Sequence, residues 1–158
     1  MLTLRTKLKN SDYYDIKKML TGGGFFSAEE QSVALELVDE TLNKPETSTY
    51  EFILAELDNK LLGYVCYGKI PCSVSSYDLY WIVVNEELRG TGVGTKLLLE
   101  AEALVKKADG LNIYIETSSR ELYSKTRAFY LKNNYEIATV LKNFYSKGDD
   151  KYIFVKTV

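Results

Sequence analysis

Three glycines at alternating positions, Gly90, Gly92 and Gly94, are the residues in this sequence best suited to binding chemistry. They follow a strand-like apolar run, residues 81–84, and they open a helix-like pattern that begins near Val93. Glycines at the start of a helix let backbone N–H groups close around a phosphate, because no Cβ atom keeps the anion away. The spacing therefore predicts a phosphate-binding loop without yet indicating which phosphate compound it binds.

Two common phosphate-binding patterns do not describe this loop. The Walker pattern G-x-x-x-x-G-K-[ST] fails because Thr95 follows the last glycine and Arg89 stands where the first glycine belongs. The dinucleotide pattern G-x-G-x-x-G fails because Thr95 or Leu97 occupies the place of its last glycine. A turn without a ligand is the structural alternative, although a single glycine would be enough for such a turn.

The residue types available for acid–base chemistry are restricted, because the chain contains no histidine. This excludes Ser-His-Asp and Cys-His catalysis and zinc sites built from histidine. The two cysteines, Cys66 and Cys72, lack the spacing of a structural metal site, so we expect no metal. Proton transfer must therefore use Asp, Glu, Tyr, Lys or Cys side chains, or water.

The elements that position these residues follow from the spacing of the apolar residues. Alternating apolar and polar residues predict strands, and apolar residues repeated every three or four positions predict helices. A capping box of Ser27 and Glu30 opens the second helix. The expected strands cover residues 2–8, 50–57, 61–67, 77–84, 112–116, 135–141 and 152–158, and the expected helices cover residues 13–20, 28–43, 93–108 and 126–132.

This order of elements predicts a mixed α/β fold. Strands joined by short turns favour antiparallel pairing, whereas the strand–helix–strand unit over residues 77–116 favours a parallel crossover. The length of 158 residues is typical of one domain, which we expect to span residues 1–158. The expected architecture is thus a mixed sheet of about seven strands flanked by about four helices.

Composition and charge exclude several classes of function. The formal net charge is −2 and the pI is about 5.3, which is unlike the basic footprint of a nucleic-acid-binding protein. No apolar run is long enough to cross a membrane, and the N-terminus lacks the apolar stretch of a signal peptide. We therefore expect a cytoplasmic protein with no nucleic-acid or membrane partner.

A third phosphate-loop pattern, R-x-x-G-x-G, fits Arg89–Gly94 in full. The segment WIVVNEELRGTGVGTKLL resembles the strand, pyrophosphate loop and helix of the GNAT superfamily, the acetyl-CoA-dependent N-acetyltransferases. The segment TRAFYLKNNYE resembles a later part of the same family, about 40 residues further on. The order of elements also matches the family across the whole chain.

The resemblance implies acetyl-CoA as cosubstrate and a twisted, mostly antiparallel sheet that is splayed between its fourth and fifth strands. The pantetheine arm of the cofactor would lie between those strands, where a backbone N–H would polarise the thioester carbonyl. The residues implied for pantetheine are Ile82, Val83 and Val84, and those implied for pyrophosphate are Arg89, Gly90, Thr91, Gly92, Val93, Gly94 and Thr95. Dimerisation is frequent in the family, so a homodimer is compatible with the resemblance.

The resemblance also implies two catalytic candidates. Tyr130 matches the family tyrosine that protonates the coenzyme A thiolate, and a phenol is protonated at neutral pH. Glu116, at the end of the expected fifth strand and near the expected place of the acceptor amine, is the candidate general base. Asp78 and Tyr80 on the fourth strand, or ordered water, are alternatives, because members of the family use different bases. Tyr123 departs from the family, because many members carry there an Asn that contacts the cofactor. The nearby groups that can replace that Asn are Ser118, Ser119, Ser124 and Lys125.

We therefore expect an enzyme that transfers the acetyl group of acetyl-CoA directly to a primary amine, of a small molecule or of a protein, in a ternary complex. The main alternative is a catalytically silent module of the same fold that binds or senses acyl-CoA. An unrelated nucleotide-binding enzyme is a third possibility. The sequence does not identify the acceptor amine.

Overall fold

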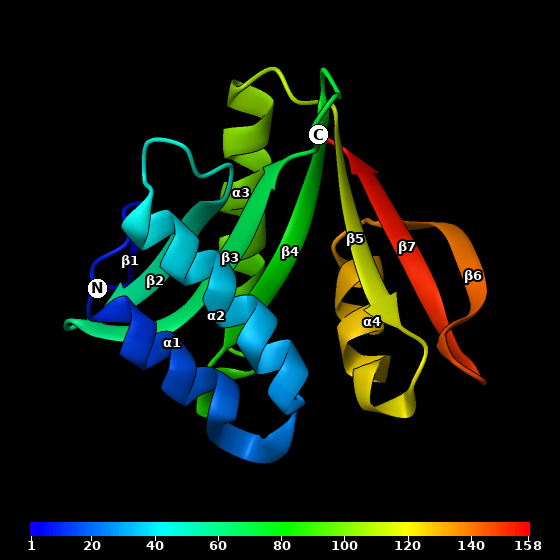
Figure 1. Ribbon diagram of the computed structural model, residues 1–158, viewed down its shortest axis with the longest axis horizontal. Helices are drawn as coiled ribbons and strands as arrows, with labels where there is room; N and C mark the ends of the chain where they lie inside the picture. The colour runs from blue at the N-terminus through cyan, green and yellow to red at the C-terminus, as the bar shows by residue number, and fades with distance from the viewer.

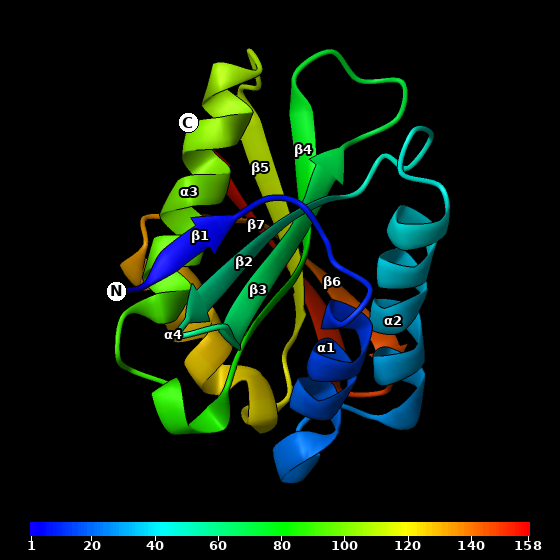
Figure 2. The same cartoon turned by 90° about the vertical axis from the view of Figure 1, so that its left-hand side faces the viewer.

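The computed structural model describes residues 1–158 and contains a seven-stranded sheet between two layers of helices (Figure 1). Helices α1 (Asp12–Thr21) and α2 (Ala28–Asn43) cover one face of the sheet. Helices α3 (Val93–Lys107) and α4 (Ser124–Lys132) cover the other face, as Figure 2 shows from the side. None of these helices has both the length and the apolar character that crossing a membrane requires.

The strands lie in the order β1-β2-β3-β4-β5-β7-β6. All neighbouring pairs are antiparallel except β4 and β5, which are parallel. The mixed, mostly antiparallel sheet that the sequence predicts is therefore confirmed. The strands are β1 (Thr3–Arg5), β2 (Glu51–Leu57), β3 (Lys60–Lys69), β4 (Ser76–Val84), β5 (Asn112–Ser118), β6 (Glu136–Ser146) and β7 (Asp149–Thr157).

Two apolar cores lie on the two faces of the sheet because side chains alternate along each strand. Ile53 belongs to the core under α3, whereas its neighbour Leu54 belongs to the core under α1 and α2. On α3, Leu97, Ala101 and Val105 are fully or almost fully buried, at the helical spacing that the sequence predicts. The two cores hold the sheet rigidly on both sides, so its central strands form a fixed frame for a site.

The last hairpin differs from the sequence-based expectation. The last two strands are expected to end at residue 141 and to begin at residue 152, but β6 continues to Ser146 and β7 begins at Asp149. Ser146 pairs with Asp149, and only Lys147 and Gly148 form the tip. Gly148 has φ +85°, which suits a tight turn. Most side chains of β6 are exposed, so the strand carries no apolar alternation that would reveal its length. The first strand, in contrast, is shorter than expected.

Strands β4 and β5 pair over only three positions and then separate (Figure 1). The paired residues are Ser76 with Asn112, Tyr77 with Ile113 and Asp78 with Tyr114. Just beyond Asp78, the register between β3 and β4 shifts, because Tyr67 pairs with Leu79 while Cys66 pairs with Trp81. Tyr80 is therefore an extra residue on β4, a β-bulge that bends the strand. The splayed sheet between the fourth and fifth strands is thus present.

Candidate active site

The loop that follows the open half of β4 presents a group of unused backbone donors. Five of its N–H groups have no acceptor in the chain, because the first helical bond of α3 is made by the N–H of Lys96 to the carbonyl of Gly92. Free N–H groups and the partial positive charge of a helix N-terminus favour an anion. The five donors belong to Gly90, Gly92, Val93, Gly94 and Thr95.

Backbone torsions explain two of the three glycines. Gly90 has φ +80° and Gly92 has φ +90°, a region that other residues rarely adopt. A Cβ atom at either position would meet no atom within 4 Å, so the torsion angle and not lack of space requires glycine. The Thr91 hydroxyl donates to the Leu88 carbonyl over 2.6 Å and fixes the turn. The loop is therefore shaped by the chain itself and is ready for a ligand.

Gly94 brings the loop against α4. A Cβ atom at Gly94 would lie 3.5 Å from the Phe129 ring, so the helix that carries Tyr130 packs beside the start of α3. Tyr130 is 4% exposed, and its ring lies 5.5 Å from that of Phe154. Burial raises the pKa of Tyr130, so its hydroxyl stays protonated, which is the state that a proton donor needs.

Arg89, the first residue of the loop, contacts the connection between α1 and α2. Its guanidinium stacks over the Phe25 ring at 5.4 Å from the ring centre. Phe25 belongs to the glycine-rich connection between α1 and α2, and its ring also contacts that of Tyr123 at 5.1 Å. Phe26, the next residue, packs on Trp81 of β4. This connection therefore joins the phosphate-binding loop to the elements on the other side of the splay.

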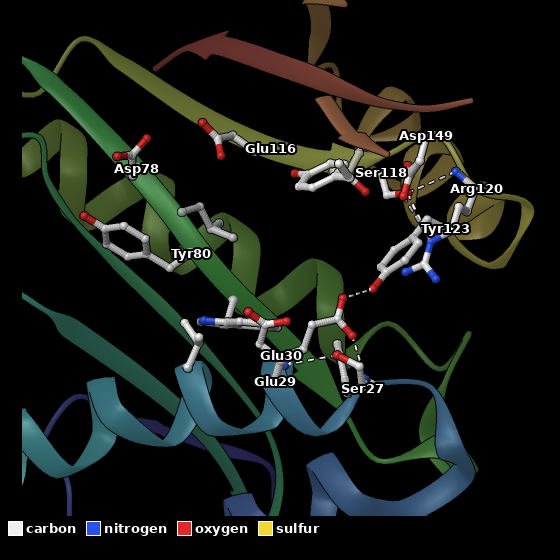
Figure 3. Close-up of a pocket in the computed structure, with 16 residues that line it drawn as sticks. Ser27, Glu29, Glu30, Asp78, Tyr80, Glu116, Ser118, Arg120, Tyr123 and Asp149 are labelled. Atoms are coloured by element: carbon white, nitrogen blue, oxygen red, sulfur yellow. Dashed lines mark hydrogen bonds and ion pairs between the residues drawn. The ribbon is translucent and has the colours of Figure 1, made fainter. Parts of the chain in front are cut away.

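A cavity of about 610 Å³ lies beside the separation of β4 and β5 (Figure 3). Its walls come from α2 and the residues before it, from β4, from β5 and the segment after it, and from the β6–β7 hairpin. The lining residues are Phe26, Ser27, Glu29, Glu30, Val33, Asp78, Leu79, Tyr80, Trp81, Glu116, Thr117, Ser118, Arg120, Tyr123, Tyr145 and Asp149.

Both carboxylates that the sequence suggests as bases line this cavity. The side chain of Glu116 is 52% exposed, and its Oε2 lies 2.8 Å from Nζ of Lys151 on β7. Asp78 has neither an ion-pair nor a hydrogen-bond partner in the chain and is half-buried. Burial, and next the charge of Glu116, raises the pKa of Asp78, while Lys151 opposes that shift. The structure therefore brings two proton acceptors of different environments to one cavity.

Tyr123 has a partner of its own. Its hydroxyl donates to Oε1 of Glu30, whose Oε2 accepts from the backbone N–H of Ser27. The capping box predicted for Ser27 and Glu30 is thus confirmed, and Figure 3 shows its second use as a bridge to the segment after β5. The guanidinium of Arg120 stacks on the same tyrosine ring at 5.3 Å. In this chain, Tyr123 therefore closes one end of the cavity.

Two lining residues, Tyr145 and Asp149, have no signal in the sequence. Tyr145 and Asp149 reach the cavity only because β7 lies between β5 and β6. Asp149 accepts a short hydrogen bond from the Ser118 hydroxyl and pairs with Arg120. Tyr80 is placed by the bulge in β4, and burial raises its pKa to about 12.

Comparisons with known proteins agree with this geometry. Residues 14–135 match the Acetyltransferase (GNAT) family. An N-alpha-acetyltransferase of Saccharolobus solfataricus is 29% identical over 121 residues, which cover 66% of this chain and 68% of that protein. The chain spans about two thirds of the length of the curated relatives it matches, from 65% to 68%.

Solved structures show the same fold. A protein of Desulfovibrio desulfuricans assigned to the GNAT acetyltransferases has a TM-score of 0.94 and 36% identity, with 99% of each chain covered. The PaiA N-acetyltransferase of Thermoplasma acidophilum, solved in complex with coenzyme A, has a TM-score of 0.75. It is 22% identical, with 100% of this chain and 99% of that chain covered, so this likeness concerns the fold alone.

Proposed function

Because this chain belongs to the GNAT acetyltransferase family, we propose that it transfers the acetyl group of acetyl-CoA directly to a primary amine. The observation that carries the proposal is the set of five free N–H groups at the end of β4, next to a strand opening that leads to an acidic cavity. The N–H groups suit the pyrophosphate of coenzyme A, and the cavity suits the amine.

The pantetheine arm is assigned to the opening between β4 and β5. Beyond Asp78, β4 has no strand partner on its β5 side, so an extended ligand can pair with that edge. Ile82, Val83 and Val84 lie on this part of β4, directly before the loop. We assign these residues to pantetheine, and the loop residues Arg89 to Thr95 to pyrophosphate, with Arg89 contributing charge from its place above Phe25.

Acetyl transfer needs a neutral amine, because an ammonium group has no lone pair with which to attack. We assign Glu116 as the group that accepts the ammonium proton, directly or through water, with Asp78 in the same cavity as a second acceptor. The free amine nitrogen then attacks the thioester carbonyl, and a new N–C bond forms. A backbone N–H on the open edge of β4 would hold the oxyanion, in the role that such donors have in acyl transfer.

Collapse of the tetrahedral intermediate breaks the C–S bond, and the thiolate of coenzyme A needs a proton. We assign the Tyr130 hydroxyl as the donor of that proton. No cysteine is suited to carry the acetyl group on the enzyme. Cys66 is buried, which raises the pKa of its thiol, and Cys72 lines a separate depression. These features support direct transfer.

Three measurements test this proposal. Calorimetry should detect binding of coenzyme A but no comparable binding of ATP or NAD, and an amine panel should release coenzyme A from acetyl-CoA. Rapid mixing with radiolabelled acetyl-CoA in the absence of acceptor should leave no label on the protein. Binding of ATP in preference to coenzyme A, or a burst of acetylated enzyme, would contradict the proposal.

A further inference from the structure

The lining of the cavity is strongly one-sided in charge. Five carboxylates line it, from α2, β4, β5 and β7, against the single guanidinium of Arg120. The lining residues carry a formal charge of minus four, five negative groups against one positive, or minus three when Lys151, which pairs with Glu116, is counted, in a chain whose net charge is only −2. The partial positive charge at the N-terminus of α2, about half a unit, offsets only a small part of it. A cavity lined mostly by charges of one sign concentrates ligands of the opposite charge.

Three of the five carboxylates already have partners within the chain. Glu116 pairs with Lys151, and Asp149 pairs with Arg120 and accepts from Ser118. Glu30 accepts from Tyr123 and from the N-cap backbone. The remaining two, Glu29 and Asp78, have no ion-pair or hydrogen-bond partner. They stand on different walls, Glu29 on α2 and Asp78 on β4 (Figure 3).

The other lining residues suit a hydrocarbon chain that carries a cation at each end. Five aromatic rings stand among the carboxylates, and methylene groups and ammonium groups both pack favourably on ring faces. The five rings are Phe26, Tyr80, Trp81, Tyr123 and Tyr145.

We infer that the acceptor is a linear aliphatic diamine or polyamine, whose reacting amine lies by Asp78 and whose second ammonium is held by Glu29. This inference rests on the proposed acetyl transfer and adds the substrate class. Asp78 is the carboxylate at the point where β4 and β5 separate, so the amine beside it is the one nearest the opening assigned to the thioester. Glu29, on the opposite wall, is exposed and free to bind a second cation.

The reaction itself then favours product release. Acetylation turns one ammonium of the diamine into a neutral amide, and the displaced protons leave through the acceptor base and the thiol of coenzyme A. The product therefore carries one positive charge fewer than the substrate, and the acidic cavity holds it less strongly. A monoamine also loses its positive charge on acetylation, but it carries no second ammonium for Glu29 to hold.

The test compares 1,4-diaminobutane with n-butylamine, which differ by one ammonium group. We expect kcat/KM for the diamine to exceed that for butylamine by about tenfold or more at low salt. Raising the ionic strength from about 0.05 M to about 0.5 M should shrink this ratio, because salt screens the cavity charge. Glu29→Gln should also reduce the ratio, whereas Glu36→Gln, an exposed change further along the same helix, should leave it at the wild-type value.

The outcomes separate this inference from the proposed function. Equal kcat/KM values for the two amines would overturn the diamine assignment and leave acetyl transfer intact. If neither of these two amines is acetylated but another amine of the panel is, the diamine assignment fails and acetyl transfer stands. If no amine of the panel is acetylated although coenzyme A binds, the proposed transfer fails, and calorimetry with both amines then tests the cation site. Tighter binding of the diamine, weakened by Glu29→Gln, would support the site, and equal or absent binding would overturn it.

Discussion

The glycine loop that we propose binds phosphate and the acidic cavity both lie beside the opening between β4 and β5, yet they are built in different ways. The loop, residues 89–95, acts through backbone N–H groups whose directions are set by two glycines with positive φ. The cavity acts through side chains that come from residues as far apart as Phe26 and Asp149. One region is therefore a product of local torsion angles, and the other is a product of the whole sheet.

This difference has consequences for substitution. Apart from Arg89 and Thr91, side-chain changes within the loop that keep the backbone path should have little effect on coenzyme A binding, whereas loss of a glycine should weaken it severely. In the cavity, the removal of one functional group should change catalysis while the fold stays intact.

The largest effect is expected at the junction, where α4 packs on the start of α3. Tyr130→Phe should lower kcat by about a thousandfold, within the range of a lost general acid, and leave coenzyme A affinity unchanged. Steady-state rates and calorimetry measure both quantities. Tyr135→Phe is the control, because that neighbouring hydroxyl is also buried and has no hydrogen-bond partner. Unchanged turnover in Tyr130→Phe would remove Tyr130 from the mechanism.

The second-largest effect on activity is expected from a change in the cavity. Glu116→Gln should lower kcat by about a hundredfold, because the amide keeps the shape of the side chain but cannot accept the proton of the amine. Coenzyme A affinity should not change, since Glu116 is not in the loop. Glu136→Gln, an exposed change on β6, serves as the control in the same assay. If Glu116→Gln keeps full activity while Asp78→Asn loses it, the base is Asp78.

The third-largest effect is expected from a change in the loop and concerns coenzyme A affinity. Gly92→Val should weaken coenzyme A binding by about thirtyfold, because a β-branched residue at φ +90° costs on the order of 1–3 kcal/mol and displaces the N–H groups. Gly22→Ala is the matched control, because Gly22 has φ −68° and no atom lies within 4 Å of the added Cβ. Calorimetry reports affinity, and circular dichroism reports the fold. Wild-type affinity in a folded Gly92→Val protein would contradict a backbone-built site.

The smallest effect is expected from Phe25, which touches both regions. Phe25→Ala removes the stacking with Arg89 and with Tyr123, and contacts of these kinds contribute about 1 kcal/mol each when exposed. We expect coenzyme A affinity and the KM for the amine to weaken together, each by about fivefold. Tyr14→Ala, at an exposed aromatic residue on α1, is the control. An effect on only one ligand would show that the two regions work independently.

Much of the fold was predictable because its signals are local. Apolar spacing predicts α3, a Ser–Glu pair predicts the start of α2, and short polar turns predict the hairpins. The ends of β6 and β7 were not predictable, because an exposed edge strand has no apolar pattern and its length depends on the hydrogen-bonded ladder. The place of β7 between β5 and β6 is likewise a property of the sheet.

The same distinction applies to the site. The sequence by itself determined the loop, because seven contiguous residues carry their own torsion angles and donors. The sequence also indicated Tyr130 as a candidate through its match to a family motif, and Glu116 through its place at the end of an expected strand. Only the tertiary structure decided that Glu116 meets Lys151, that Tyr123 bridges to Glu30, and that Glu29 faces Asp78 across one cavity. Backbone conformation is set within a few residues, whereas the convergence of distant carboxylates depends on strand order and register, which no local pattern encodes.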